Sequence, residues 1–563
     1  MIGISTKIYN YNCKYLKFYN NSNSILAFDY FEYKINIVGQ IFENINIIKK
    51  KIINSLAKKI YKDLLILNGE YAILIINKKK NFLLIGNSLN SYIPLFYYKK
   101  KKFFEIQSNI FHFNSKLFKY INKEKIYEWL VFNGRSFNNE TFLKNIKALE
   151  AGSLILNKSN QITLIKNKVF TFSKSNLSLS SCISLIKKAL GKAINIRIKQ
   201  AKKNISFGLS GGLDSRLLIS IIEKNNLKKI KTHTIGSNYS FEKKISKKVS
   251  RIIGTKHKSI NVPMKDYYNE AHNAVKDGGF NTVFKLGIVK KYYKNIKKND
   301  NSNNLILGGA GDVLTASSFS DKNLLRLKSK KEYVEWYKQK HQLFKYQEIQ
   351  KLFKHKISSE REIYYNFNKF LKKFDFRDKN FVDINDAFTF ETRIKRWHNY
   401  TLSIYSRISN FLIPTYDCHF LKVCSQIPYK FRLKDLIRKK IISETNKNLS
   451  KIQIATKSFQ TTSPGASMAT NLLKKQMSKK LLNQKSYYDV NLGYDMRTKN
   501  NINKLYKKLK NKIIKSKYFN YINFSYIEKI ISEHQAHKVD NTRKIFVLIT
   551  LLIILIKISN KNV

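Results

Sequence analysis

One short stretch restricts the fold of this chain more than any other feature. Residues 204–209 form an apolar run that fits a buried strand, and residues 216–224 fit a helix. Between them stands the hexapeptide SGGLDS, which comprises Ser210, Gly211, Gly212, Leu213, Asp214 and Ser215. Two adjacent glycines let the backbone turn tightly and bring its amide hydrogens close to an anion, because no β-carbon stands in the way. The pattern predicts a strand, an anion-binding turn and a helix in direct succession.

The residues that follow continue this alternation. Predicted strands at 230–235 and 257–262 enclose a helix from about Glu242 to Ile253, which ends at Gly254. Strands that alternate with helices indicate a doubly wound parallel sheet, whose ligands lie beyond the carboxyl ends of the strands. SGGLDS is therefore expected at the ligand-binding edge of an α/β sheet.

The residue types in this turn favour pyrophosphate. Ser210 and Ser215 add hydroxyl donors, and the new helix directs the positive end of its dipole into the same space. Asp214 alone would repel a phosphate, so its natural use is to hold a Mg²⁺ ion that bridges phosphate oxygens. The turn lacks the GK[ST] ending of loops that serve γ-phosphoryl transfer. The alternative interpretation is a glycine-rich turn in which Asp or Ser caps the helix.

The rest of the chain divides into parts that differ in their predicted secondary structure. The first 170 residues or so are strand-rich, with apolar runs at 64–67, 71–76 and 81–85. A serine-rich, aperiodic segment at 167–180 is the predicted boundary. It separates one domain at 1–170 from a second at 175–563, which is helical in character from about residue 320.

Composition excludes several classes of protein. The 563 residues carry a formal net charge of +69, but the lysines are spread along the chain without a nucleic-acid-reading motif, so we interpret them as solvated surface and expect no nucleic acid. Four cysteines without CxxC spacing favour a reducing, cytoplasmic location over a zinc site. The start shows no signal-peptide pattern. The longest apolar run, 545–556, is shorter than the roughly 20 residues of a bilayer span, so we expect a buried terminal helix and no membrane span.

At this point the motifs carry a family resemblance. SGGLDS resembles the pyrophosphate loop of the N-type ATP pyrophosphatases, and THTIG at 232–236 and IIGTKHKSI at 252–260 resemble asparagine synthetase. LGGAGDV at 307–313 resembles the second glycine-rich loop of that family, whose metal-binding Asp corresponds to Asp312. NFLIPTYD at 410–417 resembles the family's VPFLD segment. ATKSF at 455–459 resembles its lysine-bearing loop, which implies that Lys457 faces the acyl intermediate.

The amino-terminal third resembles the glutamine-hydrolysing half of the same enzymes, a class II glutamine amidotransferase domain. LNGEYAILIIN at 67–77 and IGNSLNSYIPLFYY at 85–98 follow its layout, with Asn87 where an acidic residue is expected. That half-enzyme begins MCGI, and its cysteine supplies both the nucleophile and an α-amino base. This chain begins MIGI, and neither Ile2 nor the internal Cys13 can replace that cysteine. We expect a degenerate scaffold without glutaminase activity.

The resemblance implies a fold and a reaction. The fold is an Ntn-hydrolase-like α/β/β/α sandwich followed by an adenine-nucleotide α-hydrolase-like parallel sheet, the PP-loop ATP pyrophosphatase fold, with a helical carboxyl-terminal region. The reaction is the attack of a carboxylate, aspartate or a related acid, on ATP to give an acyl-adenylate and pyrophosphate, followed by attack of ammonia or an amine. ATP and Mg²⁺ are the implied cofactors. Mg²⁺ is assigned to Asp214 and Asp312, and the nucleotide contacts are Leu209, Ser210, Gly211, Gly212, Leu213, Asp214, Ser215, Ile235, Leu307 and Gly308.

Departures from the family keep other functions open. Two glutamates of the family's second loop are replaced by Gly309 and Val313. The Glu and Arg that precede VPFLD in the family are replaced by Asn410 and Leu412. Glu391 and Arg393 lie nearby in the sequence and are candidates to substitute for that Glu and Arg. An ammonia-independent β-lactam synthetase or lasso-peptide cyclase would also lack the cysteine and is the leading alternative. A catalytically inactive binding protein and an RNA-modifying pyrophosphatase are two further classes. The sequence leaves a homodimer open.

Overall fold

The computed structural model of the chain describes most of its residues. The described residues are 3–9, 12–19, 25–77, 79–100, 103–158, 161–201, 204–236, 241–261, 292–298, 300–317, 319–377, 380–406, 408–454, 499–516, 518–536, 539 and 541–561. Ile2 and Lys457, which the sequence analysis singled out, lie outside them.

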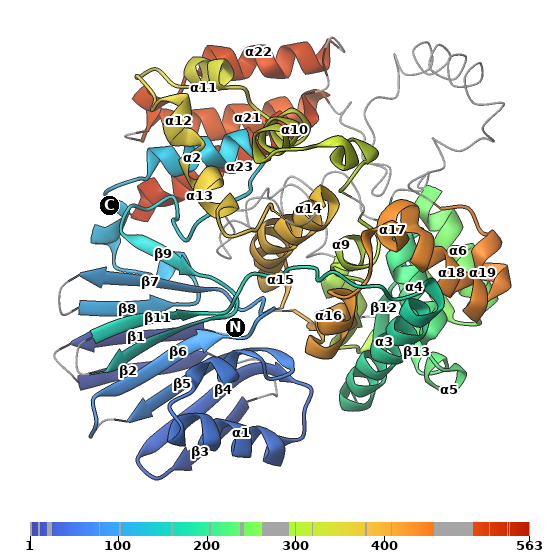
Figure 1. Cartoon of the computed structure of the whole chain (residues 1–563). Coiled ribbons are helices and arrows are strands. Elements are labelled where there is room, and N and C mark those ends of the chain that lie inside the picture. The colour runs from blue at the N-terminus through green and yellow to red at the C-terminus, as the bar shows by residue number, and fades with distance from the viewer. Residues whose placement is uncertain are drawn as a thin grey trace.

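Two antiparallel sheets form the amino-terminal part of the protein (Figure 1). The six-stranded sheet has the order β11 (Gln161–Lys166), β10 (Ser153–Lys158), β6 (Phe82–Asn87), β5 (Gly69–Asn77), β4 (Tyr33–Ile41) and β3 (Ile25–Tyr30). The five-stranded sheet has the order β2 (Asn12–Tyr19), β1 (Gly3–Tyr9), β8 (Phe103–Gln107), β7 (Leu95–Lys100) and β9 (Ile146–Leu149).

The central strand β5 shows why this part folds as a sandwich. Its side chains alternate between two cores, because successive residues of a strand point to opposite faces of the sheet. Ile73 and Ile75 pack with Ile48 and Ile52 of helix α1 (Ile45–Ala57), which covers one face. Leu74 belongs to the other core, together with residues of the five-stranded sheet. Both faces of β5 are therefore buried.

One expected strand of this region is wrong. Leu64 and Leu65 belong to a 3₁₀ helix (Tyr61–Leu65) and not to the sheet. An apolar run of four residues is too short for its periodicity to distinguish a strand from a helical turn. The runs at 71–76 and 81–85 fall in β5 and β6, as expected.

A five-stranded parallel sheet follows, after helix α3 (Leu179–Ala201). Its order is β14 (Lys256–Asn261), β13 (Ile230–Gly236), β12 (Ile205–Gly208), β15 (Asn304–Ile306) and β16 (Asn410–Leu412). All four pairings are parallel. The chain first builds the sheet from β12 towards β14 and then returns to the other side of β12. The strand order therefore reverses between β12 and β15, and ligands of doubly wound sheets bind at such a point.

Helices account for most of the described chain beyond residue 320. They include α10 (Lys330–His341), α11 (Tyr346–Leu352), α14 (Phe381–Thr389), a π-helix (Phe390–His398), α15 (Asn399–Tyr405), α16 (Cys418–Cys424), α18 (Leu436–Thr445), α21 (Lys499–Ile514), α22 (Phe524–Gln535) and α23 (Thr542–Lys561). The expected terminal helix is α23, and its apolar residues 547–556 are buried. The predicted fold class, an antiparallel α/β sandwich followed by a parallel sheet and a helical region, is confirmed.

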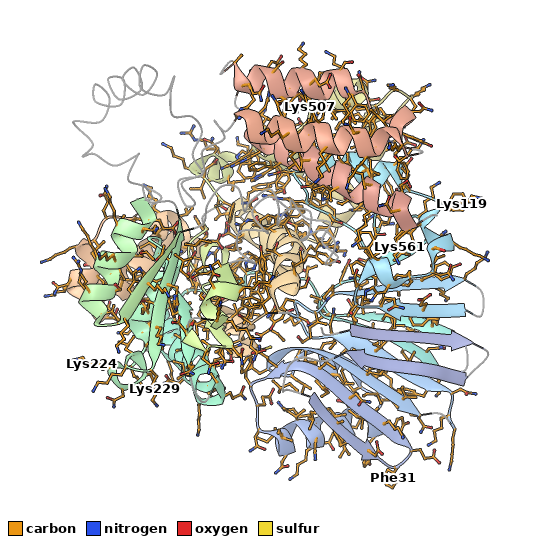
Figure 2. All side chains as sticks on the ribbon, turned by 180° about the vertical axis from the view of Figure 1, so that it is seen from behind. Phe31, Lys119, Lys224, Lys229, Lys507 and Lys561 are labelled. Atoms are coloured by element: carbon orange, nitrogen blue, oxygen red, sulfur yellow. The ribbon has the colours of Figure 1, made fainter. Side chains whose placement is uncertain are left out.

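The surface carries lysines on separate parts of the molecule. Figure 2 shows Lys224 and Lys229 beside the parallel sheet, and Lys119, Lys507 and Lys561 at the side of the terminal helices. None of the helices in the described parts of the chain is both long and apolar enough to cross a membrane.

Candidate active site

Two loops meet at the point where the strand order reverses. The first leaves β12 and enters helix α4 (Leu213–Ile221), and the second leaves β15 and enters the short helix α9 (Gly311–Leu314). Since β12 and β15 are hydrogen-bonded neighbours, their carboxyl ends open into the same space. The sequence-predicted residues of both loops therefore lie on one edge of the sheet.

Internal hydrogen bonds fix the first loop. Ser210 N donates to Ser215 Oγ over 3.0 Å, and Gly212 N donates to Ser210 Oγ over 3.2 Å. The two hydroxyl oxygens lie 2.9 Å apart. Leu209 is held from the adjacent strand β13, because its amide donates to His233 O over 2.8 Å. The loop is thus shaped before any ligand arrives, and its serine hydroxyls act first as internal braces.

A buried arginine ties this loop to the segment that follows α19 (Lys447–Lys451). Arg216 Nη2 donates to Gly211 O over 3.3 Å and to Gln453 O over 3.0 Å, while Nη1 donates to Ile452 O over 2.7 Å. Burial lowers the pKa of Arg216 to about 10, which leaves it charged at neutral pH. One guanidinium fork therefore joins the glycine-rich turn to residues 452–453, next to the segment that carries Lys457.

Asp214 stands in a cluster of charged groups. It forms an ion pair with Arg438 of α18, and the same guanidinium pairs with Asp435. Burial raises the pKa of Asp214 to about 6, Arg438 opposes this rise, and the negative charges of Asp312 and Asp435 add to it. Arg438 thus lies between two carboxylates, and Asp312 is close enough to act on Asp214.

The second loop lies directly against Asp214. A β-carbon on Gly308 would stand 3.2 Å from Asp214 Cβ, and one on Gly311 would stand 2.7 Å from Asp214 Oδ1. Between these glycines, Ala310 adopts a left-handed conformation with φ 58°. A side chain at 311 would displace the carboxylate of Asp214, so glycine at this position lets that carboxylate stay where it is. The two acidic loops are therefore in contact, as the sequence pattern predicts.

Asp312 has its own arginine partner. Arg393 Nη1 donates to Asp312 Oδ2 over 3.1 Å, and the Arg393 guanidinium lies 4.2 Å from the ring centre of Phe319. Arg393 belongs to the π-helix, a rare conformation that is frequent at functional sites. Glu391 faces elsewhere, since it accepts from Phe170 N over 2.8 Å and pairs with Lys395 over 2.7 Å.

Gly309 stands in the second loop where the family resemblance leads one to expect a glutamate, and it is surrounded by His398 and Tyr416. A β-carbon on Gly309 would stand 3.3 Å from His398 Cε1 and 3.7 Å from Tyr416 Cε1. His398 Nδ1 and Tyr416 Oη are 3.0 Å apart. Burial, together with the charge of Arg393, lowers the pKa of His398 to about 4, so this imidazole is neutral at pH 7. Val313 is fully buried and leaves no room for a charged replacement.

The residues assigned to the nucleotide follow three neighbouring strands. Ile235 lies near the end of β13, Leu209 follows β12, and Leu307 and Gly308 follow β15. Leu307 N donates to Leu412 O over 3.1 Å, which fixes the start of the second loop on β16. Each assigned residue thus lies at the carboxyl edge of the sheet.

The donor set at this edge fits a magnesium–nucleotide complex. Mg²⁺ is usually held by one or two carboxylates together with phosphate oxygens and water, and not by a complete protein cage. Asp214 and Asp312 supply two carboxylates from contacting loops, and Gly211 and Gly212 leave the turn before α4 free of bulk. No group of three or more candidate ligand side chains occurs among the residues that the structure describes. This pattern suits Mg²⁺ shared with phosphates.

No sequence motif marks the basic residues of the site. Arg216, Arg438 and Asp435 were not singled out, and Arg393 was considered only as a substitute for a missing arginine. Arg438 lies 224 residues from its partner Asp214. In a chain with 106 lysines and arginines, no local pattern marks one of them as buried. Arg216 follows SGGLDS directly, and its place on the buried face of α4 is the one signal that could have revealed it.

Comparisons with known proteins give a family and no individual relative. The family model for asparagine synthase matches residues 185–556, well over half of the chain. No curated protein matches. A solved NMN synthetase from Francisella tularensis is 15% identical, with 26% of this chain and 60% of that chain covered and a TM-score of 0.19. Glutamine phosphoribosylpyrophosphate amidotransferase from B. subtilis, complexed with ADP and GMP, is 13% identical, with 32% and 42% covered and a TM-score of 0.16.

This chain spans less than two thirds of the length of either solved structure. TM-scores this low support no inference, so the assignment depends on the family model and on the two loops. The matched region 185–556 contains both loops, the parallel sheet, the two arginines that pair with Asp214 and Asp312, and Arg216. The chain belongs to the asparagine synthase family.

Proposed function

We propose that this protein is an ATP-dependent ligase that forms a carbon–nitrogen bond. A substrate carboxylate attacks the α-phosphorus of ATP, which gives an acyl-adenylate and releases pyrophosphate. Ammonia or an amine then attacks the acyl carbon, and AMP leaves. The observation that carries this proposal is the contact between Asp214 and the second glycine-rich loop, where a β-carbon on Gly311 would stand 2.7 Å from Asp214 Oδ1.

This contact suits pyrophosphate departure. The leaving pyrophosphate gains negative charge in the transition state, and preorganised donors stabilise charge that develops there. The backbone amides of Gly211 and Gly212 and the amino-terminal end of α4 supply such donors at a site that is already braced by Ser210 and Ser215. Mg²⁺, when bound between Asp214 and Asp312, would neutralise part of the phosphate charge.

Two arginines offset the negative charges of Asp214 and Asp312. Arg438 lies between Asp214 and Asp435, and Arg393 pairs with Asp312. Each aspartate thus keeps a cationic neighbour when no nucleotide is bound. An incoming triphosphate would find both guanidinium groups within the same cluster, so these arginines are candidates for phosphate contacts once the carboxylates bind Mg²⁺.

The acyl substrate is assigned only as a small carboxylic acid, aspartate or a related compound. Gly309 replaces a glutamate that the family resemblance leads one to expect, and its surroundings are the neutral His398 and Tyr416. This difference affects substrate recognition more than ATP use. It favours a carboxylic acid whose recognition does not depend on a glutamate at position 309.

Nitrogen is proposed to come from free ammonia or from an amine, because Ile2 offers no nucleophile for glutamine hydrolysis. An amine carried by the acyl substrate itself, as in β-lactam synthetases, is the alternative source. Both routes use the same adenylation step, so the first experiment does not need to distinguish them.

ATP–pyrophosphate exchange tests the proposal. Purified protein is incubated with Mg²⁺, ATP, labelled pyrophosphate and single members of a panel of carboxylic acids. We expect exchange into ATP with at least one acid, and no exchange without acid or with EDTA present. Absence of exchange with every acid, together with no binding of ATP, would instead support a catalytically inactive binding protein.

A further inference from the structure

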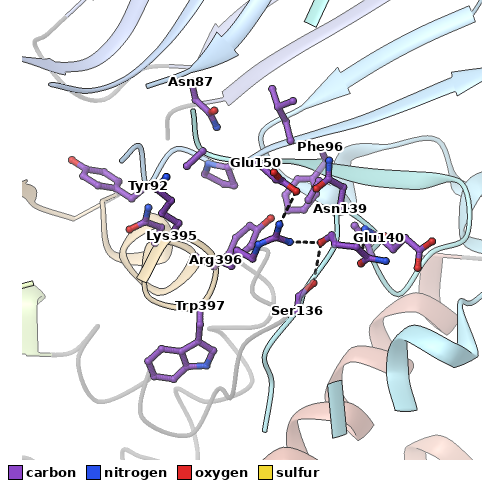
Figure 3. Close-up of a pocket in the computed structure, with 18 of the residues that line it drawn as sticks. Asn87, Tyr92, Phe96, Ser136, Asn139, Glu140, Glu150, Lys395, Arg396 and Trp397 are labelled. Carbon is purple, nitrogen blue, oxygen red and sulfur yellow. Dashed lines mark hydrogen bonds and ion pairs between the residues drawn. The ribbon is translucent and has the colours of Figure 1, made fainter. Parts of the chain in front are cut away.

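The π-helix connects the second acidic loop with the amino-terminal sandwich. Arg393 of this helix pairs with Asp312 of the loop. Three residues further along, Arg396 contacts the sandwich: its Nη2 donates to Glu150 Oε1 over 2.6 Å, and its Nη1 donates to Asn138 O over 2.5 Å. Figure 3 shows Arg396 and Glu150 pointing toward each other in the wall of a cavity. One helix thus carries an arginine for each of the two parts of the protein.

The ion pair of Glu150 and Arg396 is largely buried and stays charged. The Glu150 side chain is 19% exposed and the Arg396 side chain is 11% exposed. Burial by itself would raise the pKa of Glu150, but Arg396, together with Lys166 and Lys373, outweighs burial and lowers that pKa to about 2. A guanidinium that donates to two acceptors through separate nitrogens is held in one orientation. Arg396 is therefore a fixed point of the π-helix.

The residue directly after the π-helix makes a second connection to the sandwich. Asn399 Nδ2 donates to Ser91 O over 3.1 Å, in the loop between β6 and β7. Asn399 Oδ1 accepts from Tyr416 Oη over 2.7 Å, and Asn90 Nδ2 donates to Tyr416 O over 3.0 Å. Asn90, Asn399 and Tyr416 are all buried. The carboxyl end of the π-helix is therefore held by the same part of the protein that holds Arg396.

These polar contacts matter because the interface around them is not closely packed. A cavity of about 80 Å³ lies beside Lys395, Arg396 and Asn399. Atoms that line a void have no van der Waals partners on that side. The ion pair and the hydrogen bonds consequently have a larger share in fixing the π-helix against the sandwich.

The π-helix and Tyr416 in turn contact the second acidic loop at two places. Arg393 holds the carboxylate of Asp312. At the other place, a β-carbon on Gly309 would stand 3.3 Å from His398 Cε1 and 3.7 Å from Tyr416 Cε1. The first acidic loop is braced by its own serines, whereas the second is contacted by residues whose position depends on the sandwich.

We propose that the amino-terminal sandwich anchors the second acidic loop and that Glu150 is a positioning residue for the ligase reaction. Through Arg396, Glu150 holds the π-helix in place. Arg393 therefore stays within reach of Asp312, whose carboxylate is kept at the proposed metal–pyrophosphate site. A domain in which Ile2 offers no nucleophile thus serves adenylation instead. The expected effect on ATP rests on the proposed function, whereas the link between Glu150 and the loop does not.

Hydrogen–deuterium exchange followed by mass spectrometry tests this link without any ligand. Glu150→Gln keeps the shape of the side chain and removes its charge. In this variant we expect the amides of residues 309–314 to exchange at least about threefold faster, because a loop whose contacts are loosened opens more often. Calorimetric titration of the same variant should show Mg²⁺-dependent ATP affinity that is weaker by at least about tenfold.

Glu348→Gln is the matched control. Glu348 of α11 pairs with Lys544 of α23 over 2.5 Å, and these side chains are 23% and 21% exposed. The control pair is thus similar in length and burial, but it involves neither the sandwich nor the π-helix. Its loss should lower the thermal midpoint by a similar amount, while exchange at 309–314 and ATP affinity stay unchanged.

Variants of Arg396 test the pair from its other side. Arg396→Met should reproduce the effects of Glu150→Gln, and Arg396→Lys, which restores a positive charge opposite Glu150, should recover part of the loss. These variants also decide the question if Glu150→Gln does not fold.

Three results would overturn the proposal. They are unchanged exchange at 309–314 in Glu150→Gln and Arg396→Met, an equal rise in exchange over the whole chain, and faster exchange at 309–314 without weaker ATP binding. If the unmodified protein bound no ATP, the proposed function would fail by itself, and exchange at 309–314 would still confirm or refute the link to Glu150.

Discussion

Asp214 Oδ1 lies 2.7 Å from the position that a β-carbon on Gly311 would occupy. The first acidic loop and the second glycine-rich loop are therefore packed without space for even one methyl group between them. Because Asp312 follows Gly311 directly, this contact holds the second carboxylate next to the first. The geometry of the proposed metal site thus depends on a glycine.

Gly311→Ala should disrupt this geometry with little effect on folding. The added β-carbon would push the Asp214 carboxylate away from its partner Arg438, so we expect Mg²⁺-dependent ATP binding to weaken at least about tenfold. The thermal midpoint should change little, since alanine is favourable in the helix α9. Calorimetric titration with ATP, with and without Mg²⁺, measures the effect.

Gly191→Ala is the control for that variant. A β-carbon at Gly191, inside α3, would meet Ile221 Cγ2 at an ordinary 3.6 Å. This substitution should stabilise the fold by about 0.5–1 kcal/mol, because glycine in a helix interior costs backbone entropy. ATP affinity should stay the same. If Gly311→Ala also leaves ATP affinity unchanged, the contact between the loops is irrelevant to binding.

Arg216→Lys should weaken both the fold and the nucleotide site. A lysine carries one ammonium group and cannot reproduce the fork that reaches Gly211 O, Ile452 O and Gln453 O. The loss of these hydrogen bonds, one of them to the buried Gly211, should cost about 1–3 kcal/mol in unfolding free energy. Denaturant unfolding measures this loss, and Arg251→Lys on the exposed side of α6 (Phe241–Ile253) should have no comparable effect. Equal stability of both variants would contradict the bracing role of Arg216.

A buried ion cluster between the sandwich and α3 should make stability depend on pH. Arg197 contacts both Glu70, at 3.2 Å, and Asp417, at 3.4 Å. Burial raises the pKa of Glu70 from 4.5 to about 7; Arg197 opposes this rise and Asp417 adds to it. The folded state therefore keeps a proton that the unfolded state loses between about pH 4.5 and pH 7, and stability falls as pH rises through that interval.

Glu70→Gln tests this dependence. Glutamine keeps the shape and removes the surplus negative charge, so the variant should lose the decline in unfolding free energy between pH 4.5 and 7. At pH 8 it should be at least as stable as the unmodified protein. Glu335→Gln, at an exposed position on α10, serves as the control. A pH profile identical to that of the unmodified chain would show that Glu70 does not titrate in this range.

Glutamine should not serve as a nitrogen source. The chain has isoleucine at position 2, where the family resemblance leads one to expect the catalytic cysteine. We expect no glutamate release from glutamine in a coupled dehydrogenase assay, while ammonium or an amine supports amide formation with any acid that shows exchange. Steady glutaminase turnover by the purified chain would overturn the assignment of a degenerate domain.

Much of the fold followed from the sequence because its signals are local. The alternation of strands and helices and the turn at 210–215 identified the parallel sheet, and the acidic loops were placed on neighbouring strands correctly. Strand β16, only three residues long, has too little periodicity to be recognised. Its place beside β15 depends on long-range pairing, which no window of the sequence contains.

The site itself was predicted only in part, for the same physical reason. Asp214 and Asp312 lie in motifs with a recognisable shape, whereas Arg438 and Arg393 reach them from helices more than 80 residues away in the sequence. The π-helix that carries Arg393 has no sequence signature that distinguishes it from an ordinary helix. The pairing of each carboxylate with its own arginine could be found only from the structure.

Mg²⁺-dependent ATP binding by the Asp214→Asn and Asp312→Asn variants shows whether the two acidic loops hold one metal–nucleotide complex. Both variants keep the shape of the side chain and remove one negative charge. Each variant should lose at least about tenfold in ATP affinity in the presence of Mg²⁺, with a thermal midpoint close to that of the unmodified protein. Unchanged Mg²⁺-dependent ATP affinity in both variants would contradict the claim that these two loops form a shared metal–pyrophosphate site.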